Sequence, residues 1–428
     1  MVAQDLVGQR IKAIRRQRGL SQAQLAHPEL SDSYVSLIES GKRTPTPAVL
    51  ELLAQKLDCS LTYLVNGVTA EQMQELEVGL SFARMALENG EVAEARRRYA
   101  ELLADNSLAG LASLRQDAQY GFALALEACG ELGEAIAVLS ELSESEAVTA
   151  ERKIAVALAM CRCHRERGDF SAAVEVGEAV LADVGSGAWT DGLVELGATL
   201  LLAYLVRGDL LRAGHFANEL LAAAEGLGSP RATVASCWNA ALVAEKAGRG
   251  EEAMSLIERA LAIHSETGDQ RNLARLHQAY AFTMLRVRPS DVEKARDLLL
   301  RAARDYDETS TSTSDKARCS LSLAYAELTM DHPEDAAEHA SAARDLIGES
   351  SGGMHMDAYL LLSQAHHLLH RDEESDAELS KVSSWLKDAP QTRKLADKWM
   401  AVAELRDRAG DQDLSVDAYK RALACAGL

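Results

Sequence analysis

The sequence has few aromatic residues and few prolines. Of its 428 residues only 4% are Phe, Trp or Tyr, and 7 are proline. Alanine and leucine recur every few positions, and both lose little conformational freedom in a helix. Sheet proteins draw instead on β-branched and aromatic residues. The composition therefore argues against a sandwich or barrel and predicts an all-α fold.

Long apolar runs and paired cysteines are also missing. No stretch approaches 18 uninterrupted apolar residues, and the first residues form a charged amphipathic segment, not a signal peptide. The seven cysteines are odd in number and scattered. We interpret them as buried thiols of a cytoplasmic protein. Cys161 and Cys163 lack a second ligand pair at zinc spacing, and His366 and His370 lack a partner carboxylate, so we expect no metal.

The signatures of catalysis are absent as well. There is no nucleophile elbow, no zinc-protease HExxH and no kinase motif. We therefore expect neither an enzyme nor a bound cofactor.

Positive charge is scarce overall but not evenly so. The formal net charge is −20. Residues 1–68 hold 8 Lys and Arg against 6 Asp and Glu, and the remaining chain holds 37 against 59. The sequence thus predicts a slightly basic head of net +2 on an acidic body of net −22.

Five short helices are expected in the head. Val7, Ile11 and Ile14 fall on one helical face. Ser21 and Gln24 form a capping-box pattern for a second helix, which Pro28 keeps short. A third helix begins at residues 31–33 and reaches about residue 40, a fourth spans 46–57, and a fifth is short.

The segments LSQAQLA, SYVSLIESGKRTP and AVLELLAQKLDCS together resemble the lambda-repressor-like helix-turn-helix of the Xre family of bacterial regulators. The resemblance covers roughly residues 6–66, and we assign residues 1–66 to a DNA-binding domain. It implies that the third helix enters the major groove of double-stranded DNA. The implied DNA-binding residues are Gln22, Ser31, Asp32, Ser33, Tyr34, Ser36, Lys42 and Arg43.

Two of these residues have open roles. Asp32 stands where many relatives carry Arg or Gln, and it either reads a base or only caps the helix. Tyr34 either contacts phosphate or packs against the second helix. Because a head of net +2 gives few phosphate contacts, we expect a homodimer that reads two half-sites of a palindromic operator.

The body contains an internal repeat of about 40 residues. Each repeat has a turn residue and, a few positions after it, a small residue in the second helix of the pair, which we call the later residue. Twelve positions before it, in the first helix, lies another and mostly small residue, the earlier residue, and we expect the two helices to approach each other closely at these two positions. The later residues are Ala95, Ala135, Ala173, Ala213, Ala253, Ala295, Ala336, Ala377 and Ser415. The earlier residues are Ala83, Ala123, Cys161, Leu201, Ala241, Thr283, Ala324, Ala365 and Ala403.

Segments such as GDFSAAVEVGEAVL and GRGEEAMSLIERAL resemble tetratricopeptide repeats in a longer, forty-residue form. About nine helix pairs would stack into a right-handed superhelix over residues 71–428, which would bind a ligand and dimerise. The linker after the head would be very short.

In that fold the first helix of each pair lines the concave surface. Our candidate ligand-binding residues there are Tyr120, Glu127, Arg162, Arg165, Trp238, Asn239, Glu245, His277, Tyr280, Arg318, Tyr325, Tyr359 and His366. Polar and aromatic side chains in a groove suit an extended peptide. The alternative for each aromatic residue is packing between repeats.

A helix-turn-helix head on a tetratricopeptide body is similar to the RRNPP group of quorum-sensing regulators. The resemblance implies a cytoplasmic dimer in which a short imported peptide binds the groove and repositions the paired heads. The acidic body favours a cationic peptide. The alternatives are a protein-interaction module or a regulator that senses a small metabolite.

Overall fold

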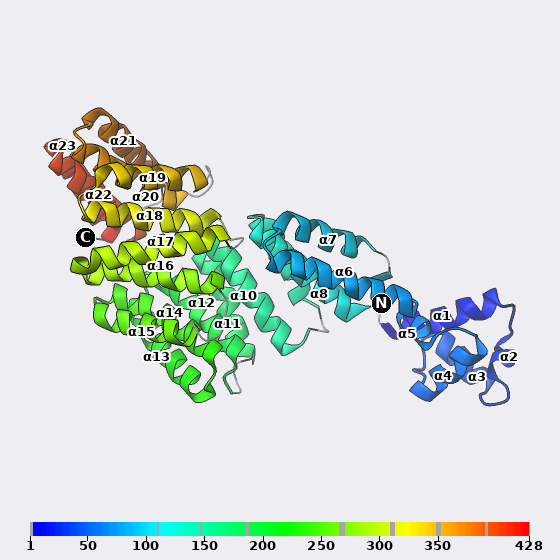
Figure 1. The fold of residues 1–428 in the computed structure, drawn as a ribbon. Helices are drawn as coiled ribbons and strands as arrows, with labels where there is room; N and C mark the ends of the chain where they lie inside the picture. The colour runs from blue at the N-terminus through cyan, green and yellow to red at the C-terminus, as the bar shows by residue number, and fades with distance from the viewer. Residues whose placement is uncertain are drawn as a thin grey trace. The chain divides into compact units, whose positions relative to one another are not determined.

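The computed structural model describes residues 3–105, 107–108, 111–145, 148–184, 188–264, 270–308, 313–347, 352–389 and 393–427. Over these residues the protein is helical and contains no strand, which confirms the all-α prediction (Figure 1). The chain forms two compact units, Met1–Ser145 and Glu146–Leu428. Each unit is described by itself below.

Unit 1 begins with the five helices expected of the head. They are α1 (Ala3–Gln17), α2 (Gln22–Ala26), α3 (Asp32–Glu39), α4 (Pro47–Lys56) and α5 (Leu61–Asn66). The capping box predicted for α2 is present, because Ser21 accepts from the Gln24 amide while the Gln24 side chain accepts from the Ser21 amide. A left-handed Gly41 follows α3, where the sequence predicted its end.

The head has its own hydrophobic core. Ile11, Leu25, Val35, Ile38 and Leu53 are fully buried in it. Gly8 allows α1 to approach α3 closely, since a Cβ at this position would collide with the Ile38 carbonyl. This close approach fixes how α3 lies on the rest of the head.

Two helix pairs complete unit 1. They are α6 (Ala70–Glu88) with α7 (Val92–Ala104), and α8 (Ala112–Ala128) with α9 (Leu132–Ser143). Only three residues separate α5 from α6, as the predicted short linker required. Tyr99 of α7 is buried against Gly121 of α8, whose missing side chain leaves room for the ring.

Unit 2 consists of seven further helix pairs among its described residues. They are α10 (Ala150–Glu166) with α11 (Phe170–Val184), α12 (Asp191–Arg207) with α13 (Leu210–Leu227), α14 (Pro230–Lys246) with α15 (Gly250–His264), α16 (Gln270–Val287) with α17 (Val292–Glu308), α18 (Thr313–Thr329) with α19 (Pro333–Ile347), α20 (Gly352–Leu368) with α21 (Asp372–Asp388), and α22 (Arg393–Arg408) with α23 (Gln412–Ala426). A single 3₁₀ turn, η2 (Pro289–Asp291), joins α16 to α17.

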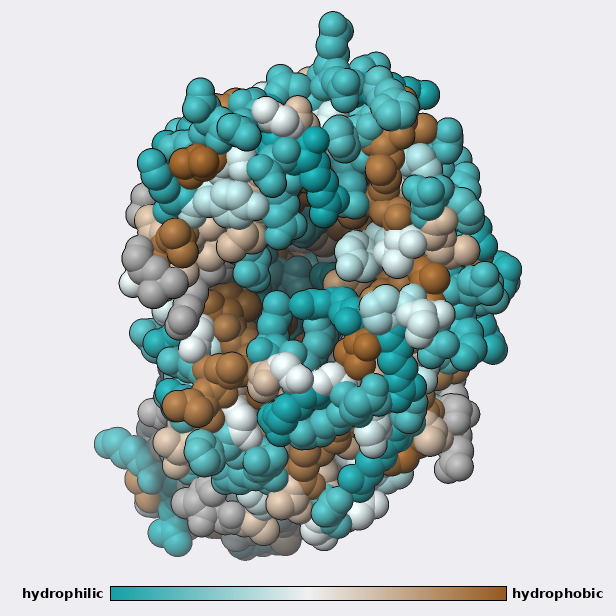
Figure 2. Space-filling view, turned by 90° about the vertical axis from the view of Figure 1, so that its left-hand side faces the viewer, coloured by the Kyte–Doolittle hydropathy of each residue, from teal (hydrophilic) through white to brown (hydrophobic). Residues whose placement is uncertain are grey.

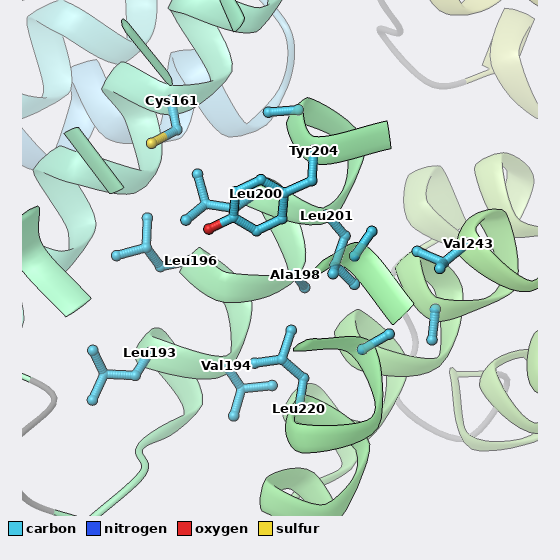
Figure 3. Close-up of a cluster of buried hydrophobic side chains, with 14 of the residues drawn as sticks. Cys161, Leu193, Val194, Leu196, Ala198, Leu200, Leu201, Tyr204, Leu220 and Val243 are labelled. Atoms are coloured by element: carbon cyan, nitrogen blue, oxygen red, sulfur yellow. The ribbon is translucent and has the colours of Figure 1, made fainter. Parts of the chain in front are cut away.

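The core of unit 2 is continuous from one pair to the next. Leu193, Leu196 and Leu200 of α12 are fully buried, and Figure 3 shows them between Cys161 of α10 and Leu220 of α13. No pair could bury these leucines alone, so stacking of neighbours supplies the stability of a solenoid.

The turn inside most pairs uses a residue in the left-handed conformation. Gly90 and Gly208 have φ of 76° and 85°. Asp331 and His370 have φ of 62° and 56° and occupy the same place in two later pairs. His370 is therefore a turn residue and does not lie on a helix face with His366.

The two helices of each pair cross at the predicted small residues, with one exception. Every predicted later residue is buried apart from Ala377, which is exposed. Ser375 is buried in its place, 6% exposed, and its hydroxyl donates to the Ser363 carbonyl at 2.9 Å. The crossing pair in this repeat is therefore Ser363 with Ser375, two residues earlier than predicted.

The division into domains 1–66 and 71–428 stays a prediction. The helices of the head end at Asn66 and α6 begins at Ala70. The compact units, however, divide between the second and third helix pairs, at Ser145 and Glu146.

The position of this crossing can be tested by enlarging each candidate residue. We expect Ser375→Leu to lower the free energy of unfolding by about 1–3 kcal/mol, because the larger side chain overpacks the crossing and loses the hydrogen bond. Ala377→Leu, the matched control, should change it by less than about 0.5 kcal/mol. Thermal unfolding followed by the fluorescence of Trp385 and Trp399 measures both, and the opposite order would restore Ala377 as the crossing residue.

Candidate nucleic-acid interface and ligand groove

Helix α3 presents a polar face at its first turns. Ser31 is the N-cap, since its hydroxyl accepts from the Tyr34 amide at 3.2 Å. Asp32 is then the first helical residue, which corrects the alternative that it caps the helix. Ser33, Ser36 and Asp32 are all exposed, and the Asp32 carboxylate lies 3.4 Å from His27 Nε2.

The opposite face of α3 carries a buried ion pair. The Arg15 guanidinium of α1 donates to both Glu39 carboxylate oxygens, at 2.6 and 3.0 Å, and to the Leu20 carbonyl. The Gln22 amide of α2 donates to the same carboxylate at 2.8 Å. One carboxylate thus ties α1, α2 and α3 together, and the Glu39 side chain is only 2% exposed.

Burial alone would raise the pKa of Glu39. The hydrogen bonds from Arg15 and Gln22 outweigh that cost, so the pKa lies below its usual 4.5. The carboxylate is therefore charged whenever the head is folded near neutral pH.

The remaining predicted DNA-binding residues fall into two groups. Lys42 and Arg43 are exposed just beyond the end of α3. Gln22 turns inward to Glu39, and Tyr34 is half-buried against the head core. Arg43 lies over the Tyr34 ring at 5.4 Å, so the two residues are coupled. Their contacts with DNA stay a prediction.

Sequence reasoning missed three positioning residues in the head. Arg15 and Glu39 are 24 positions apart and showed no local pattern. Lys56 of α4 donates to the carbonyls of Leu25, Ala26 and His27, and so holds the end of α2. A lone lysine in an amphipathic helix gave no signal for this role.

All candidate groove residues lie on first helices of their pairs, as the sequence required. Unit 1 holds Tyr120 and Glu127 on α8. Unit 2 holds Arg162 and Arg165 on α10, Trp238, Asn239 and Glu245 on α14, His277 and Tyr280 on α16, Arg318 and Tyr325 on α18, and Tyr359 and His366 on α20.

Several of the aromatic candidates pack between repeats. Trp238 and Tyr280 border buried clusters, and the Tyr280 hydroxyl donates to Glu258 at 2.8 Å. Tyr359 packs against a buried cluster that includes Ala324 of α18 and Ala340 of α19. Tyr325, in contrast, is 41% exposed. The packing alternative therefore describes Trp238, Tyr280 and Tyr359 better than Tyr325.

Charged candidates on first helices are joined by ion pairs. Glu245 of α14 lies 2.7 Å from Arg286 of α16. Asp315 of α18 is nearly buried, accepts from Arg275 of α16, and lies 3.7 Å from Arg318. The Glu245–Arg286 and Asp315–Arg275 pairs connect successive repeats.

The structure brings the charges of two lysines, Lys398 of α22 and Lys246 of α14, close enough to interact, which the sequence did not suggest. Helix α22 approaches α12, five pairs earlier. Lys398 of α22 is ion-paired with Asp357 of α20. Burial and then the charge of Lys246 lower the pKa of Lys398 to about 8. Figure 2 shows the hollow in the face of unit 2, with hydrophilic and hydrophobic side chains around it.

One group of metal-type ligands occurs among the described residues. Donor atoms of Glu327, His332 and Asp335 lie within 4.8 Å of one another. The buried Glu327 carboxylate already accepts from Arg296 and is 3.0 Å from His332 Nδ1. The group is best explained as an ion-pair network between α17, α18 and α19. Among the residues searched for membrane spans, no helix is both long and apolar enough to cross a bilayer.

Comparisons with known proteins agree with this arrangement. Residues 11–64 match the helix-turn-helix family HTH_3. The chain is 39% identical over 67 residues to the uncharacterised HTH-type transcriptional regulator y4dJ of Sinorhizobium fredii, covering 15% of this chain and 87% of that protein. It is 40% identical over 72 residues to the immunity repressor protein of Bacillus phage phi105, covering 17% of this chain and spanning about half, 50%, of that repressor.

Most of the chain also resembles a solved structure. The apo form of the quorum sensor NprR from B. thuringiensis matches with a TM-score of 0.51 at 14% identity, over 82% of this chain and 99% of that one. At this identity the similarity concerns the fold.

The chain thus has a helix-turn-helix domain followed by a helical solenoid, and its fold resembles that of the quorum sensor NprR. Through its N-terminal domain it belongs to the HTH_3, Xre-like family of helix-turn-helix transcriptional regulators.

The Glu39 network generates a stability prediction. We expect Glu39→Gln to destabilise the head by about 3–5 kcal/mol, because it leaves the Arg15 charge buried without a counter-charge. Hydrogen exchange over residues 7–40 in the full chain should rise sharply. Glu51→Gln, an exposed control on α4, should leave the exchange unchanged.

The same network predicts an acid response. Because the folded pKa of Glu39 is lowered, its contribution is present above the usual carboxyl value of 4.5 and is lost as the pH falls through the folded pKa. We expect the hydrogen-exchange protection of residues 7–40, corrected for the pH dependence of the intrinsic exchange rates, to fall over this pH range in the wild type but not in Glu39→Gln. An identical acid response in both proteins would contradict the assignment.

Proposed function

We propose that this protein is a cytoplasmic, homodimeric transcriptional regulator that binds a palindromic operator. Its solenoid binds an effector, most simply a short signalling peptide, which repositions the paired heads. The observation that carries the proposal is the exposed polar first turn of α3, followed directly by exposed Lys42 and Arg43.

The head supplies both kinds of contact that sequence-specific binding needs. Ser33 and Ser36 project from the exposed face of α3, where short hydroxyl side chains can reach base edges. Lys42 and Arg43 are placed to neutralise phosphates at the end of the same helix. The buried Glu39 network supports this by holding α3 at a fixed angle to α1 and α2.

The solenoid supplies the sensing function. The first helices carry charged, amide and aromatic side chains, of which Tyr325 and Arg318 are exposed. Such a surface suits an extended peptide, whose backbone needs polar partners and whose side chains need apolar ones. The similarity in fold to a quorum sensor supports the same choice.

Phosphate contact is testable by salt dependence. We expect Lys42→Ala and Arg43→Ala each to weaken binding to operator fragments selected from host genomic DNA, and to reduce the slope of log affinity against log salt by about 1. Ser36→Ala should change the preferred sequence without changing that slope.

The control removes a positive charge from the solenoid instead. Arg249→Ala, in an exposed pair with Glu252, should leave DNA affinity and slope as in the wild type. Equal effects of Arg249→Ala and Lys42→Ala, or binding without sequence preference in the wild type, would refute the proposed interface.

The effector site is testable with two tyrosines. We expect Tyr325→Ala to weaken binding of peptides captured from a synthetic octapeptide library about tenfold at unchanged thermal stability. Tyr280→Ala should instead lower stability by about 2 kcal/mol, because its ring packs between repeats. Isothermal titration and thermal unfolding separate the two effects. Native mass spectrometry that finds a protein or metabolite instead of a peptide would favour the other two kinds of effector.

A further inference from the structure

Helix α6 carries an exposed apolar stripe. Val78, Phe82 and Met85 are 46%, 51% and 53% exposed. They lie at i, i+4 and i+7 and so share one face of the helix. The Arg98 guanidinium lies 5.8 Å from the centre of the Phe82 ring and leaves half of that residue exposed.

The equivalent positions in the later repeats show what such a face contacts in this fold. Counted from the first crossing residue of a repeat, which is Ala83 here, the three residues lie at positions −5, −1 and +2. The residues at +2 in the eight later repeats are all buried: Ala125, Cys163, Ala203, Val243, Leu285, Ala326, Ala365 and Leu405. Those at −5 are buried in seven of the eight: Ala118, Val156, Leu196, Ser236, Gln278, Cys319 and Ala358.

These positions pack against the preceding helix pair. In α18, Cys319, Leu323 and Ala326 share one buried cluster with Ala295, Leu299 and other residues of α16 and α17. In α20, the same three positions each lie in a cluster with residues of α18 and α19. Val78 and Met85 therefore occupy positions that contact the preceding helix pair in later repeats. The position of Phe82 is buried in six of the eight later repeats, whereas Phe122 is half-buried and Phe282 is 37% exposed.

Among the described residues only the five helices of the head come before α6, with no solenoid-type helix pair, and the described part of unit 1 leaves the stripe exposed. End repeats of solenoids normally carry a polar outer face, because an apolar one must be covered. Val78, Phe82 and Met85 do not follow that rule. A binding partner for this face is the direct explanation.

We propose that the stripe is the dimer interface, and that its occupant is α6 of a second copy of this chain, packed antiparallel across a two-fold axis near Phe82. The stripe is nearly symmetric about Phe82, so Val78 of each copy meets Met85 of the other. An isologous contact of this kind closes at two subunits.

The place of α6 in the chain supports a second copy as the occupant. Only three residues separate α6 from the last helix of the head, so joining two α6 helices ties together two heads. This step rests on the proposed function, since half-site reading requires paired heads. Val78, Phe82 and Met85 are themselves uncharged, so burying them between two copies removes no charge from water.

Sedimentation equilibrium of the full chain tests the interface. We expect a dimer in the wild type and a dissociation constant roughly a hundredfold weaker in Phe82→Glu, with unchanged far-ultraviolet circular dichroism and thermal midpoint. Leu211→Glu is the matched control, because Leu211 is apolar and 84% exposed on α13. It should remain dimeric.

Covalent trapping gives positive evidence. Phe82→Cys, in a background with Cys59 and Cys129 changed to serine, should form a disulfide-linked dimer under mild oxidation, since the two positions meet at the axis. Leu211→Cys in the same background should not.

The outcomes separate the interface from the proposed function. A monomeric wild type at about 50 µM, or a dimer unaffected by Phe82→Glu, overturns the interface, and protection of α6 in such a monomer would mean that its own head covers the stripe. A Phe82→Glu monomer that has lost operator binding supports both proposals. A Phe82→Glu monomer that binds the operator as tightly as the wild type keeps the interface but contradicts paired reading.

Discussion

Each repeat depends on the close crossing of its two helices at residues twelve positions apart. Small side chains occupy most of these crossings, and at several of them a polar residue donates a hydrogen bond to the facing carbonyl. Ser415 donates to the carbonyl of Ala403 and the Cys161 thiol to that of Ala173. Because the crossing fixes the angle within each pair, it also fixes which residues of the first helix meet the preceding pair. The solenoid, its core and its uncovered first face all follow from this one constraint.

That constraint explains how far the sequence could predict the body. The crossing residue comes five positions after the left-handed turn residue, as with Gly90 and Ala95. Counting from glycine therefore placed most repeats correctly. In the eighth pair the left-handed residue is His370, and five positions later comes Ser375. Histidine gives no turn signal in a sequence, so the pattern predicts the nearby Ala377 as the crossing residue. This prediction is wrong because the left-handed conformation of His370 could not be foreseen, whereas the predicted repeat itself is present.

The head shows a different limit. Its helices were predictable because caps and breakers act locally, as at Ser21 and Gly41. The inward orientation of the Gln22 side chain was not predictable, because it depends on the buried carboxylate of Glu39, 17 positions away. A glutamate near the end of an amphipathic helix normally faces solvent. Only the packing of α1 on α3, through Gly8, reveals that Glu39 lies inside. Ser33, Ser36, Lys42 and Arg43 needed no such knowledge, because exposure is the default for polar residues.

The groove shows why net charge is a poor guide to a ligand. The body carries −22, which favoured a cationic peptide in the sequence. In the structure, acids on the first helices are joined to bases of neighbouring repeats, as in Glu245 with Arg286 and Asp315 with Arg275. Charges more than about 10 Å apart are largely screened from one another, so the net charge of the body does not describe the charge at any one point of its surface.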